Sequence, residues 1–526
     1  MTNLIKQTKK SLSRMERGQV LVVVAVSIVA IIAIMGLALD VGMMFIGNAR
    51  LRRAVDAAAL AAALQYRAGF HMDYLDNTAT EFLRLNGIND PNARVLICWD
   101  HIPNPGDSDY DDYLIHNDPT LCTDPPRKLV RVVATGTIQL AFLPVIGINQ
   151  VPIAAEAISE TASVAVALLI DRSESMTYTA PPATSTFHDP MRDPSVCNNS
   201  ADPNFNPNDP NFIDPITHTN TDPYDSTYTG YCRPFDEVKK AAVSFVNDLY
   251  FPYDLVAVVT FDQNANQTLI GTPPLTSIWS NNKDEIIKAI KGLTVDQGVG
   301  VYPNGLPSRY YDPVTGYYLG LGCPSTDPAH QADYPDIYPS PAPCTTTNIG
   351  GGLDAAGVLF NINPPVRQNE LWVTVLLTDG VANAGYYVND SGKTIYYCPP
   401  DTWNNTNMPP KCHNGYTKSN PANRHTPNTD PHYDAEDYAY DAAEFVAHDQ
   451  SALLFTIGLG PQVVTPSSVD GTKLGELFLQ YAADHACDPT NLTTICPGTY
   501  TFAPNGAALQ EVFRKIAENI ATRLSH

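Results

Sequence analysis

Basic residues are scarce in this sequence of 526 residues: 32 Lys and Arg are set against 55 Asp and Glu, giving a formal net charge of −23. Eight of the basic residues lie within residues 1–53, so the remainder of the chain is more acidic still. Such a surface repels the phosphate backbone of nucleic acids. We therefore expect no nucleic-acid partner, and we expect an affinity for cations instead.

The sequence also lacks the short motifs of common enzyme classes. It contains no HExxH metalloprotease motif and no GxSxG nucleophile elbow. The SGKT stretch at 391–394 matches the end of a phosphate-binding P-loop, but Tyr387 replaces the glycine that begins that motif. No catalytic residue can be named, and we predict a binding protein rather than an enzyme.

Cysteine is absent from the first 97 residues, and an even number, ten, follows. An even count in an exported chain indicates disulfides. Each cysteine shares a loop-like stretch with its sequence neighbour, which favours five local pairs: Cys98–Cys122, Cys197–Cys232, Cys323–Cys344, Cys398–Cys412 and Cys487–Cys496. The alternative is a zinc site among Cys398, Cys412, His413, His425 and His432, which lack CxxC or HxxxH spacing.

Residues 20–39 contain no charged side chain. Twenty helical residues at about 1.5 Å each span about 30 Å, the hydrocarbon thickness of a bilayer. We predict a single transmembrane helix over 19–46, with the basic residues 1–18 in the cytoplasm and the rest in the periplasm or at the cell surface. A cleaved signal peptide is the alternative, but its apolar core is shorter, about 7–15 residues. Asp40 ends the apolar run and is expected at the interface rather than in a proton relay.

Residues 47–160 are predicted to form a small α+β juxtamembrane domain. The stretch 48–68 is alanine-rich and free of Gly and Pro, so it is expected to continue the membrane helix. A second helix is expected over 76–87, with Asn77 as its N-cap. Strand-like runs follow at 93–100, 128–143 and 151–170.

From residue 161 to 526, apolar strands alternate with helices. The strands are expected at 163–170, 254–261, 370–378, 451–459 and 498–503. Continuous Val, Leu and Ile runs indicate strands buried on both faces, and intervening helices indicate a doubly wound, mainly parallel α/β sheet. Three inserts rich in Pro, Asn, Asp and Tyr interrupt this pattern at about 177–232, 294–346 and 381–432.

Oxygen-bearing side chains follow two of the predicted strands. Asp171, Ser173 and Ser175 come directly after the first strand, Asp379 follows the third, and Thr347 precedes a helix. Ligands of open parallel sheets bind at the carboxyl ends of the strands. Carboxylates and hydroxyls are hard ligands, which favours a divalent cation, Mg²⁺ first, with Mn²⁺ and Ca²⁺ as alternatives.

These residues resemble a known motif. DRSESM at 171–176, TNIG at 347–350 and LLTDG at 376–380 are similar, in order, to the metal-ion-dependent adhesion site (MIDAS) of von Willebrand factor A (VWA) domains. The resemblance implies a VWA or Rossmann-like domain over 161–526. Asp171, Ser173 and Ser175 match the DxSxS motif, Thr347 the second-loop threonine and Asp379 the third-loop aspartate. In that family the cation keeps one open position, which an acidic group of the partner occupies.

Residues 17–65 resemble the membrane anchor of G-type Flp/tight-adherence (Tad) pilus-assembly proteins, with weaker likeness to about residue 160. That family also joins such anchors to VWA domains. The fifth residue after Gly18 is Val23 rather than the glutamate of a prepilin cleavage site. The resemblance therefore favours an anchored accessory or adhesive role over that of a pilin.

The leading hypothesis is a membrane-anchored, extracytoplasmic adhesion protein of the Tad type. Its cation would bind a carboxylate on a protein or surface ligand, and other Tad pilus components are further candidate partners. One alternative is a metal-dependent hydrolase, for which Glu174 is the nearest general base. Another is a pilus-assembly scaffold with an idle metal site. In a VWA-type sheet, as the resemblance implies, the three inserts would leave from the rim that holds the cation. They are then expected to converge into a disulfide-pinned cap there. The alternative is three separate loops.

Overall fold

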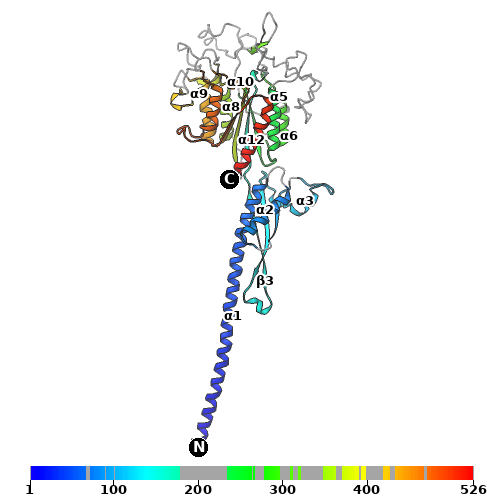
Figure 1. The fold of residues 1–526 in the computed structure, drawn as a ribbon, viewed down its shortest axis with the longest axis vertical. Coiled ribbons are helices and arrows are strands. Elements are labelled where there is room, and N and C mark those ends of the chain that lie inside the picture. The colour runs from blue at the N-terminus through cyan, green and yellow to red at the C-terminus, as the bar shows by residue number, and fades with distance from the viewer. Residues whose placement is uncertain are drawn as a thin grey trace. The chain divides into compact units, whose positions relative to one another are not determined.

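The computed structural model divides the chain into two compact units, Met1–Thr161 and Ala162–His526, each described by itself. The described residues are 2–66, 71–88, 91–99, 101–177, 234–262, 265–266, 278–296, 309–311, 318–321, 347–362, 370–389, 392–397, 419–426, 433–466 and 471–524. Figure 1 shows a long helix in the first unit and an α/β arrangement in the second.

A single helix, α1 (Thr2–Gln65), runs through the first unit. Side chains in its apolar stretch are largely exposed, as Leu21 and Val29 illustrate at 73% and 67%. From Leu51 onward one face of the same helix is buried against the rest of the unit. The stretch that begins at Val20 is long and apolar enough to cross a membrane. The expected helical continuation into the alanine-rich stretch is confirmed as far as Gln65, since no break separates the apolar and alanine-rich parts of α1.

The rest of the first unit packs against the second half of α1. Helix α2 (Met72–Leu85) lies beside it, followed by an antiparallel sheet in the order β1 (Asn92–Ile97), β2 (Leu129–Gln139) and β3 (Gln150–Glu160). Shorter elements are α3 (Tyr110–His116), η1 (Pro119–Leu121) and η2 (Leu143–Ile146). Alternate residues of β2, namely Val130, Val132 and Ala134, are buried, as one covered sheet face requires.

The expected N-cap of the second helix is wrong. The helix begins at Met72, so Asn77 lies within it, and His71 occupies the cap position. Met72 and Leu75 are buried in the core of the unit. Burial of these apolar side chains adds an N-terminal turn, which local capping preference alone does not predict.

The second unit is built on a six-stranded sheet in the order β13-β12-β9-β4-β5-β6. Five strands are parallel: β4 (Val164–Asp171), β5 (Leu255–Phe261), β9 (Leu371–Thr378), β12 (Leu453–Leu459) and β13 (Tyr500–Ala503). The short edge strand β6 (Ala265–Asn266) is antiparallel. All eight residues of β4 are buried, as expected for a central strand with both faces covered.

Two hydrophobic cores lie on the two faces of this sheet. On one face, Val166, Leu168 and Ile170 of β4 belong to a cluster with α5 (Phe235–Asp248), α6 (Lys283–Lys291) and α12 (Gly506–Leu524). On the other face, Ala167 and Leu169 belong to a cluster with α8 (Ile349–Ile362), α9 (Ala435–Glu444) and α11 (Leu474–Asp484). In Figure 1 the α5, α6 and α12 layer lies on the opposite side of the sheet from α8 and α9.

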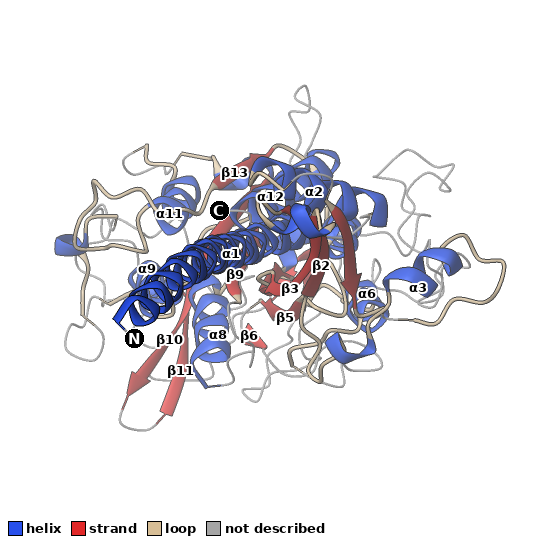
Figure 2. Ribbon diagram, turned by 90° about the horizontal axis from the view of Figure 1, so that it is seen from below, coloured by secondary structure: helices blue, strands red, loops and turns tan. Residues whose placement is uncertain are grey.

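The remaining elements of the second unit are short. They are η3 (Glu174–Thr177), η6 (Pro421–Asn423), the π-helical turn η7 (Phe445–Asp449) and α10 (Gly460–Val463). Two antiparallel hairpins, β7–β8 (Arg309–Tyr311, Tyr318–Leu321) and β10–β11 (Ala384–Asn389, Gly392–Tyr397), complete the described elements. Figure 2 shows β10 and β11 as a separate ribbon beside α8.

Both hairpins lie in segments that are predicted from the sequence to be irregular inserts. In the insert after Asp379, the Tyr- and Val-rich run 384–389 pairs with the run 392–397. Aromatic and β-branched residues favour extended pairing over loop structure. The greater part of the three inserts lies outside the described residues, as do Cys197, Cys232, Cys323, Cys344, Cys398 and Cys412. Their expected convergence into a cap therefore stays a prediction.

Candidate functional site

Asp171 is the last residue of β4, and its side chain is fully buried. Its Oδ1 accepts a hydrogen bond of 2.8 Å from the Ser173 backbone N–H, and its Oδ2 accepts one of 2.6 Å from the Thr378 hydroxyl. Thr378 ends the neighbouring parallel strand β9. The two strands therefore end at the same edge of the sheet, and the Asp171 carboxylate lies between the loops that follow them.

The two serine hydroxyls extend this arrangement to Asp379. Ser173 Oγ lies 2.9 Å from Ser175 Oγ, and the Ser175 hydroxyl donates a hydrogen bond of 2.7 Å to Asp379 Oδ1. All three residues are buried, with Ser173 2% exposed. The structure thus brings Asp171, Ser173, Ser175 and Asp379 into one hydrogen-bonded group.

Thr347 lies beside this group, in a third loop. A Cβ placed on Gly380 would lie 3.3 Å from Thr347 Oγ1, so the threonine hydroxyl lies beside the residue that follows Asp379. The Thr347 backbone N–H donates a hydrogen bond of 2.6 Å to Asn383 Oδ1, which fixes the loop. We call Asp171, Ser173, Ser175, Thr347 and Asp379 the carboxyl-end cluster.

Polar contacts between the strand-end loops hold the carboxyl-end cluster in place. The Arg172 guanidinium lies 2.9 Å from the carboxylate of Asp262, the residue after β5. The backbone carbonyl of Asp262 accepts a hydrogen bond of 2.8 Å from the Asn348 N–H. The Asn348 side chain in turn accepts one from the Gly351 N–H, which caps the first turn of α8. Three loops are therefore tied together around the cluster.

Burial and mutual repulsion act on the two carboxyl groups of the cluster. Desolvation raises the pKa of Asp171 to about 6, against the opposing hydrogen bonds from Ser173 and Thr378. Desolvation, followed by the nearby charge of Asp171, raises the pKa of Asp379 well above its usual range. Two carboxylates that repel each other at a buried site are stabilised by a bound cation.

The donor set of the carboxyl-end cluster fits a hard divalent cation. It offers two carboxylates and three hydroxyls, all of them oxygen donors. Within the described ranges, no group of three or more His, Cys, Asp and Glu suited to a metal is found. The all-oxygen donor set of the cluster would suit Mg²⁺ or Mn²⁺ better than zinc.

The alternative zinc residues gain no support from the part of the chain that can be described. His425 Nδ1 lies 3.0 Å from Asp437 Oδ2, close to the N-terminus of α9. The other four candidates, Cys398, Cys412, His413 and His432, lie outside the described residues.

The sequence motifs do not point to several residues that position the cluster. Thr378 and Asn383 each form a hydrogen bond with a member of the carboxyl-end cluster. Arg172 and Asp262 form an ion pair that connects the loops after β4 and β5. Thr378 could have been identified from the sequence, because it directly precedes Asp379 at the end of an apolar strand. Nothing in the local sequence connects Asn383 with Thr347, which lies 36 positions earlier.

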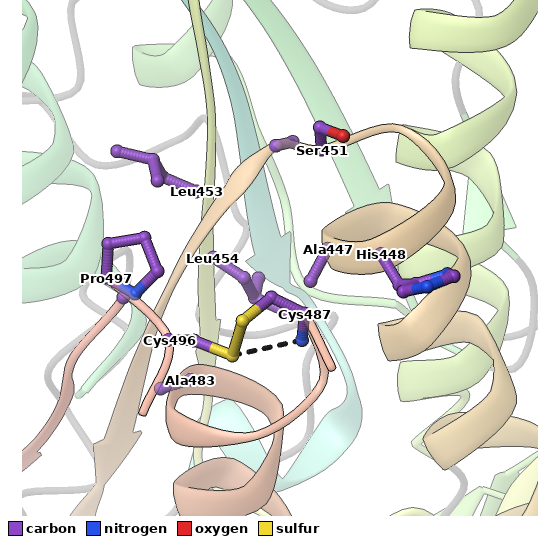
Figure 3. A pocket seen from close by; sticks show the side chains of 11 residues that line it. Ala447, His448, Ser451, Leu453, Leu454, Ala483, Cys487, Cys496 and Pro497 are labelled. Carbon is purple, nitrogen blue, oxygen red and sulfur yellow. Dashed lines mark hydrogen bonds between the residues drawn. A yellow bond between two sulfur atoms is a disulfide. The ribbon is translucent and has the colours of Figure 1, made fainter. Parts of the chain in front are cut away.

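Two of the expected disulfides are present in the structure. Cys98 is joined to Cys122 in the first unit, and Cys487 to Cys496 in the second. The second disulfide lines a pocket with Ala447, Leu454 and Pro497, as Figure 3 shows. This pocket lies at the amino end of β12, and the carboxyl-end cluster lies at the opposite edge of the parallel sheet.

Residues 18–65 match the family model described as Putative Flp pilus-assembly TadE/G-like. The match covers the apolar part of α1 and its alanine-rich continuation. A search of curated proteins returned no match to this chain.

Several solved structures show remote similarity. The PilB minor pilin from Streptococcus sanguinis is 15% identical, with a TM-score of 0.33, over 75% of this chain and 76% of that one. The vWF domain of the type V pili tip protein Mfa5 from Porphyromonas gingivalis is 14% identical, with a TM-score of 0.32, over 70% and 97%. Proximal thread matrix protein 1 from the mussel byssus, with a zinc-occupied MIDAS motif, is 10% identical, with a TM-score of 0.29, over 69% and 48%. These TM-scores are too low to establish a shared fold.

Proposed function

We propose that this chain is a membrane-anchored adhesion protein of the Tad pilus type. Its carboxyl-end cluster would bind a divalent cation, and the cation would bind an acidic group on a partner. The second unit would be a VWA-type domain, consistent with its five parallel strands and the helices on both faces. The N-terminal helix would span the membrane once, with residues 1–18 in the cytoplasm.

The observation that carries the proposal is the convergence of two buried, mutually repelling carboxylates with serine hydroxyls at adjacent strand ends. Buried charge of one sign is unfavourable unless it is compensated. A cation held by Asp171, Ser173, Ser175, Thr347 and Asp379 would supply that compensation. Mg²⁺ takes six oxygen ligands, so an acidic group of the partner can complete its shell.

The membrane and pilus parts of the proposal have separate support. The family match over residues 18–65 points to Tad pilus assembly, and the apolar length of α1 suits a membrane span. Binding is proposed rather than hydrolysis because Glu174 is the only candidate general base beside Asp171 in the sequence. Hydrolysis would need such a base to reach a substrate proton or the attacking water.

The test uses the full chain in detergent micelles, titrated with Mg²⁺, Mn²⁺ and Ca²⁺ by isothermal calorimetry. Retention on a carboxylate-bearing matrix is then compared with retention on a matched amide-bearing matrix, with Mg²⁺ or EDTA. We expect one cation per chain and retention only on the carboxylate matrix with Mg²⁺. Absence of cation binding would reject the site, whereas cation binding without retention would reject only the acidic partner.

A further inference from the structure

Asp40 makes an unusual set of contacts for a residue of the apolar segment. It is the only charged residue between Arg17 and Arg50, and its side chain is fully buried. Its carboxylate accepts hydrogen bonds from three consecutive backbone N–H groups, those of Ala141, Phe142 and Leu143, at 2.7–3.2 Å. These amides belong to the tip of the β2–β3 hairpin, residues 140–149, which we call the hairpin tip.

The hairpin tip lies along the apolar part of α1. A Cβ on Gly36 would be 2.8 Å from the Phe142 ring, and a Cβ on Gly47 would be 2.4 Å from Ile138. Gly36 precedes Asp40 by about one helical turn, roughly 6 Å toward the N-terminus. Figure 1 shows the hairpin running beside α1. The absence of side chains at Gly36 and Gly47 is what permits this close approach.

The outer surface of the hairpin tip is apolar and uncovered. Val145 is 86% exposed, Ile146 71% and Ile148 45%, and no charged residue occurs from 132 to 155. The exposed apolar surface of α1 continues past Asp40 to Phe45 and Ile46, which are 77% and 60% exposed. The tip therefore lies within the length of helix that presents apolar side chains outward.

We propose that the hairpin tip is a second membrane-contacting element, and that it inserts Val145, Ile146 and their neighbours into the outer part of the bilayer. A carboxylate within an apolar span requires internal partners, because lipid offers none. The three tip amides supply them, so the tip is held at the depth of Asp40. The same hydrogen bonds shield the Asp40 carboxylate from lipid. They also align the apolar tip with the apolar stretch of α1. This inference rests on the membrane span proposed above.

Tryptophan placed at the tip tests the inference. The full chain would be reconstituted into phosphatidylcholine vesicles with or without bromine-labelled acyl chains, which quench only fluorophores that reach them. Val145→Trp is the test variant, and Ile146→Trp repeats it. Leu37→Trp, on the apolar part of α1, reports whether the helix is embedded. Ile102→Trp, a 78% exposed position in the same unit, is the matched control outside the membrane.

We expect brominated lipid to remove most of the emission added by Val145→Trp, Ile146→Trp and Leu37→Trp, and none of that added by Ile102→Trp. Quenching of Leu37→Trp without quenching of either tip variant would overturn the inference and leave the anchor standing. No quenching of Leu37→Trp would overturn both. A blue shift of the tip variants without quenching would indicate a protein partner and would also overturn the inference.

Discussion

The Ser175 hydroxyl donates a hydrogen bond of 2.7 Å to Asp379 Oδ1, although 204 positions separate the two residues in the sequence. This bond joins the loop after β4 to the loop after β9. The proton of Ser175 faces a carboxylate and one lone pair of its oxygen accepts from the Ser173 hydroxyl, so the other lone pair remains for a cation. A metal can therefore enter the cluster without breaking the contact between the two loops.

Asp379→Asn should abolish cation binding and raise the stability of the cation-free chain. The substitution removes a buried charge that Asp171 repels, and the amide oxygen can still accept the Ser175 hydrogen bond. Calorimetry with Mg²⁺ and thermal unfolding in EDTA would measure both effects. Asp449→Asn, with a side chain 59% exposed, is the control. Retained affinity in Asp379→Asn would reject the site assignment.

In EDTA, the second unit should lose stability as the pH rises from about 4 to 8. Burial raises the pKa of Asp171 to about 6 and that of Asp379 well above its usual range. Unfolded aspartates have a pKa of about 4, so the folded state binds more protons between these values. The destabilisation is absent below pH 4 and grows as the pH passes through the folded values.

Saturating Mg²⁺ should remove most of this pH dependence at pH 7–8, because the cation compensates the two charges. Thermal unfolding at each pH, with EDTA or with Mg²⁺, would measure it. Stability in EDTA that rises with pH over the same range would contradict the assignment of paired, buried carboxylates.

Thr378→Val should weaken cation binding while it preserves the shape of the core. The Thr378 hydroxyl donates a 2.6 Å hydrogen bond to Asp171 Oδ2 and is fully buried. Loss of a hydrogen bond to a charged group costs about 1.5–3 kcal/mol, so we expect Kd to rise by roughly tenfold or more. Thr378→Ser retains the hydroxyl and should restore most of the affinity. Equal affinities in the valine and serine variants would show that Thr378 does not position Asp171.

The parallel strands and the apolar helix could be predicted because each is encoded locally. The uninterrupted run of β4 and the charge-free stretch after Gln19 need no knowledge of distant residues. The grouping of Asp171 with Asp379 was predictable by a general rule, since parallel strands end at a common edge. The hydrogen bond from the Thr347 backbone to Asn383 was not predictable, because it depends on how two loops lie against each other in the fold.

The hydrogen bonds of Asp40 also could not be predicted from the sequence. The sequence indicated a carboxylate at the end of an apolar run and suggested an interfacial position. The structure buries it under backbone amides about 100 positions away, which no side-chain pattern encodes. Helix α2 likewise begins at Met72 because its first turn is buried, and capping preference had suggested Asn77.

Removal of the Cys487–Cys496 disulfide should destabilise the second unit without changing cation affinity. The bond closes a loop of nine positions, for which the chain-entropy model gives about 2–3 kcal/mol. The double variant Cys487→Ser, Cys496→Ser should unfold at lower urea concentration, measured on the full chain with Mg²⁺ present. Its Kd for Mg²⁺ should match that of the parent, because the disulfide lies at the amino end of β12. A large loss of affinity would show coupling between the two edges of the sheet.

Asp40→Ala should release the hairpin tip from α1. The variant leaves the N–H groups of Ala141, Phe142 and Leu143 without their acceptor, and each buried unsatisfied group costs about 1–3 kcal/mol. Amide hydrogen exchange over 140–149 should therefore accelerate by roughly tenfold or more, since 1.4 kcal/mol corresponds to a factor of ten. Asp40→Asn, which keeps one acceptor oxygen, should fall between the parent and Asp40→Ala. Asp56→Ala, at an exposed position of the same helix, should leave this exchange unchanged. Unaltered exchange at the tip in Asp40→Ala would show that packing against Gly36 and Gly47 suffices to hold the hairpin.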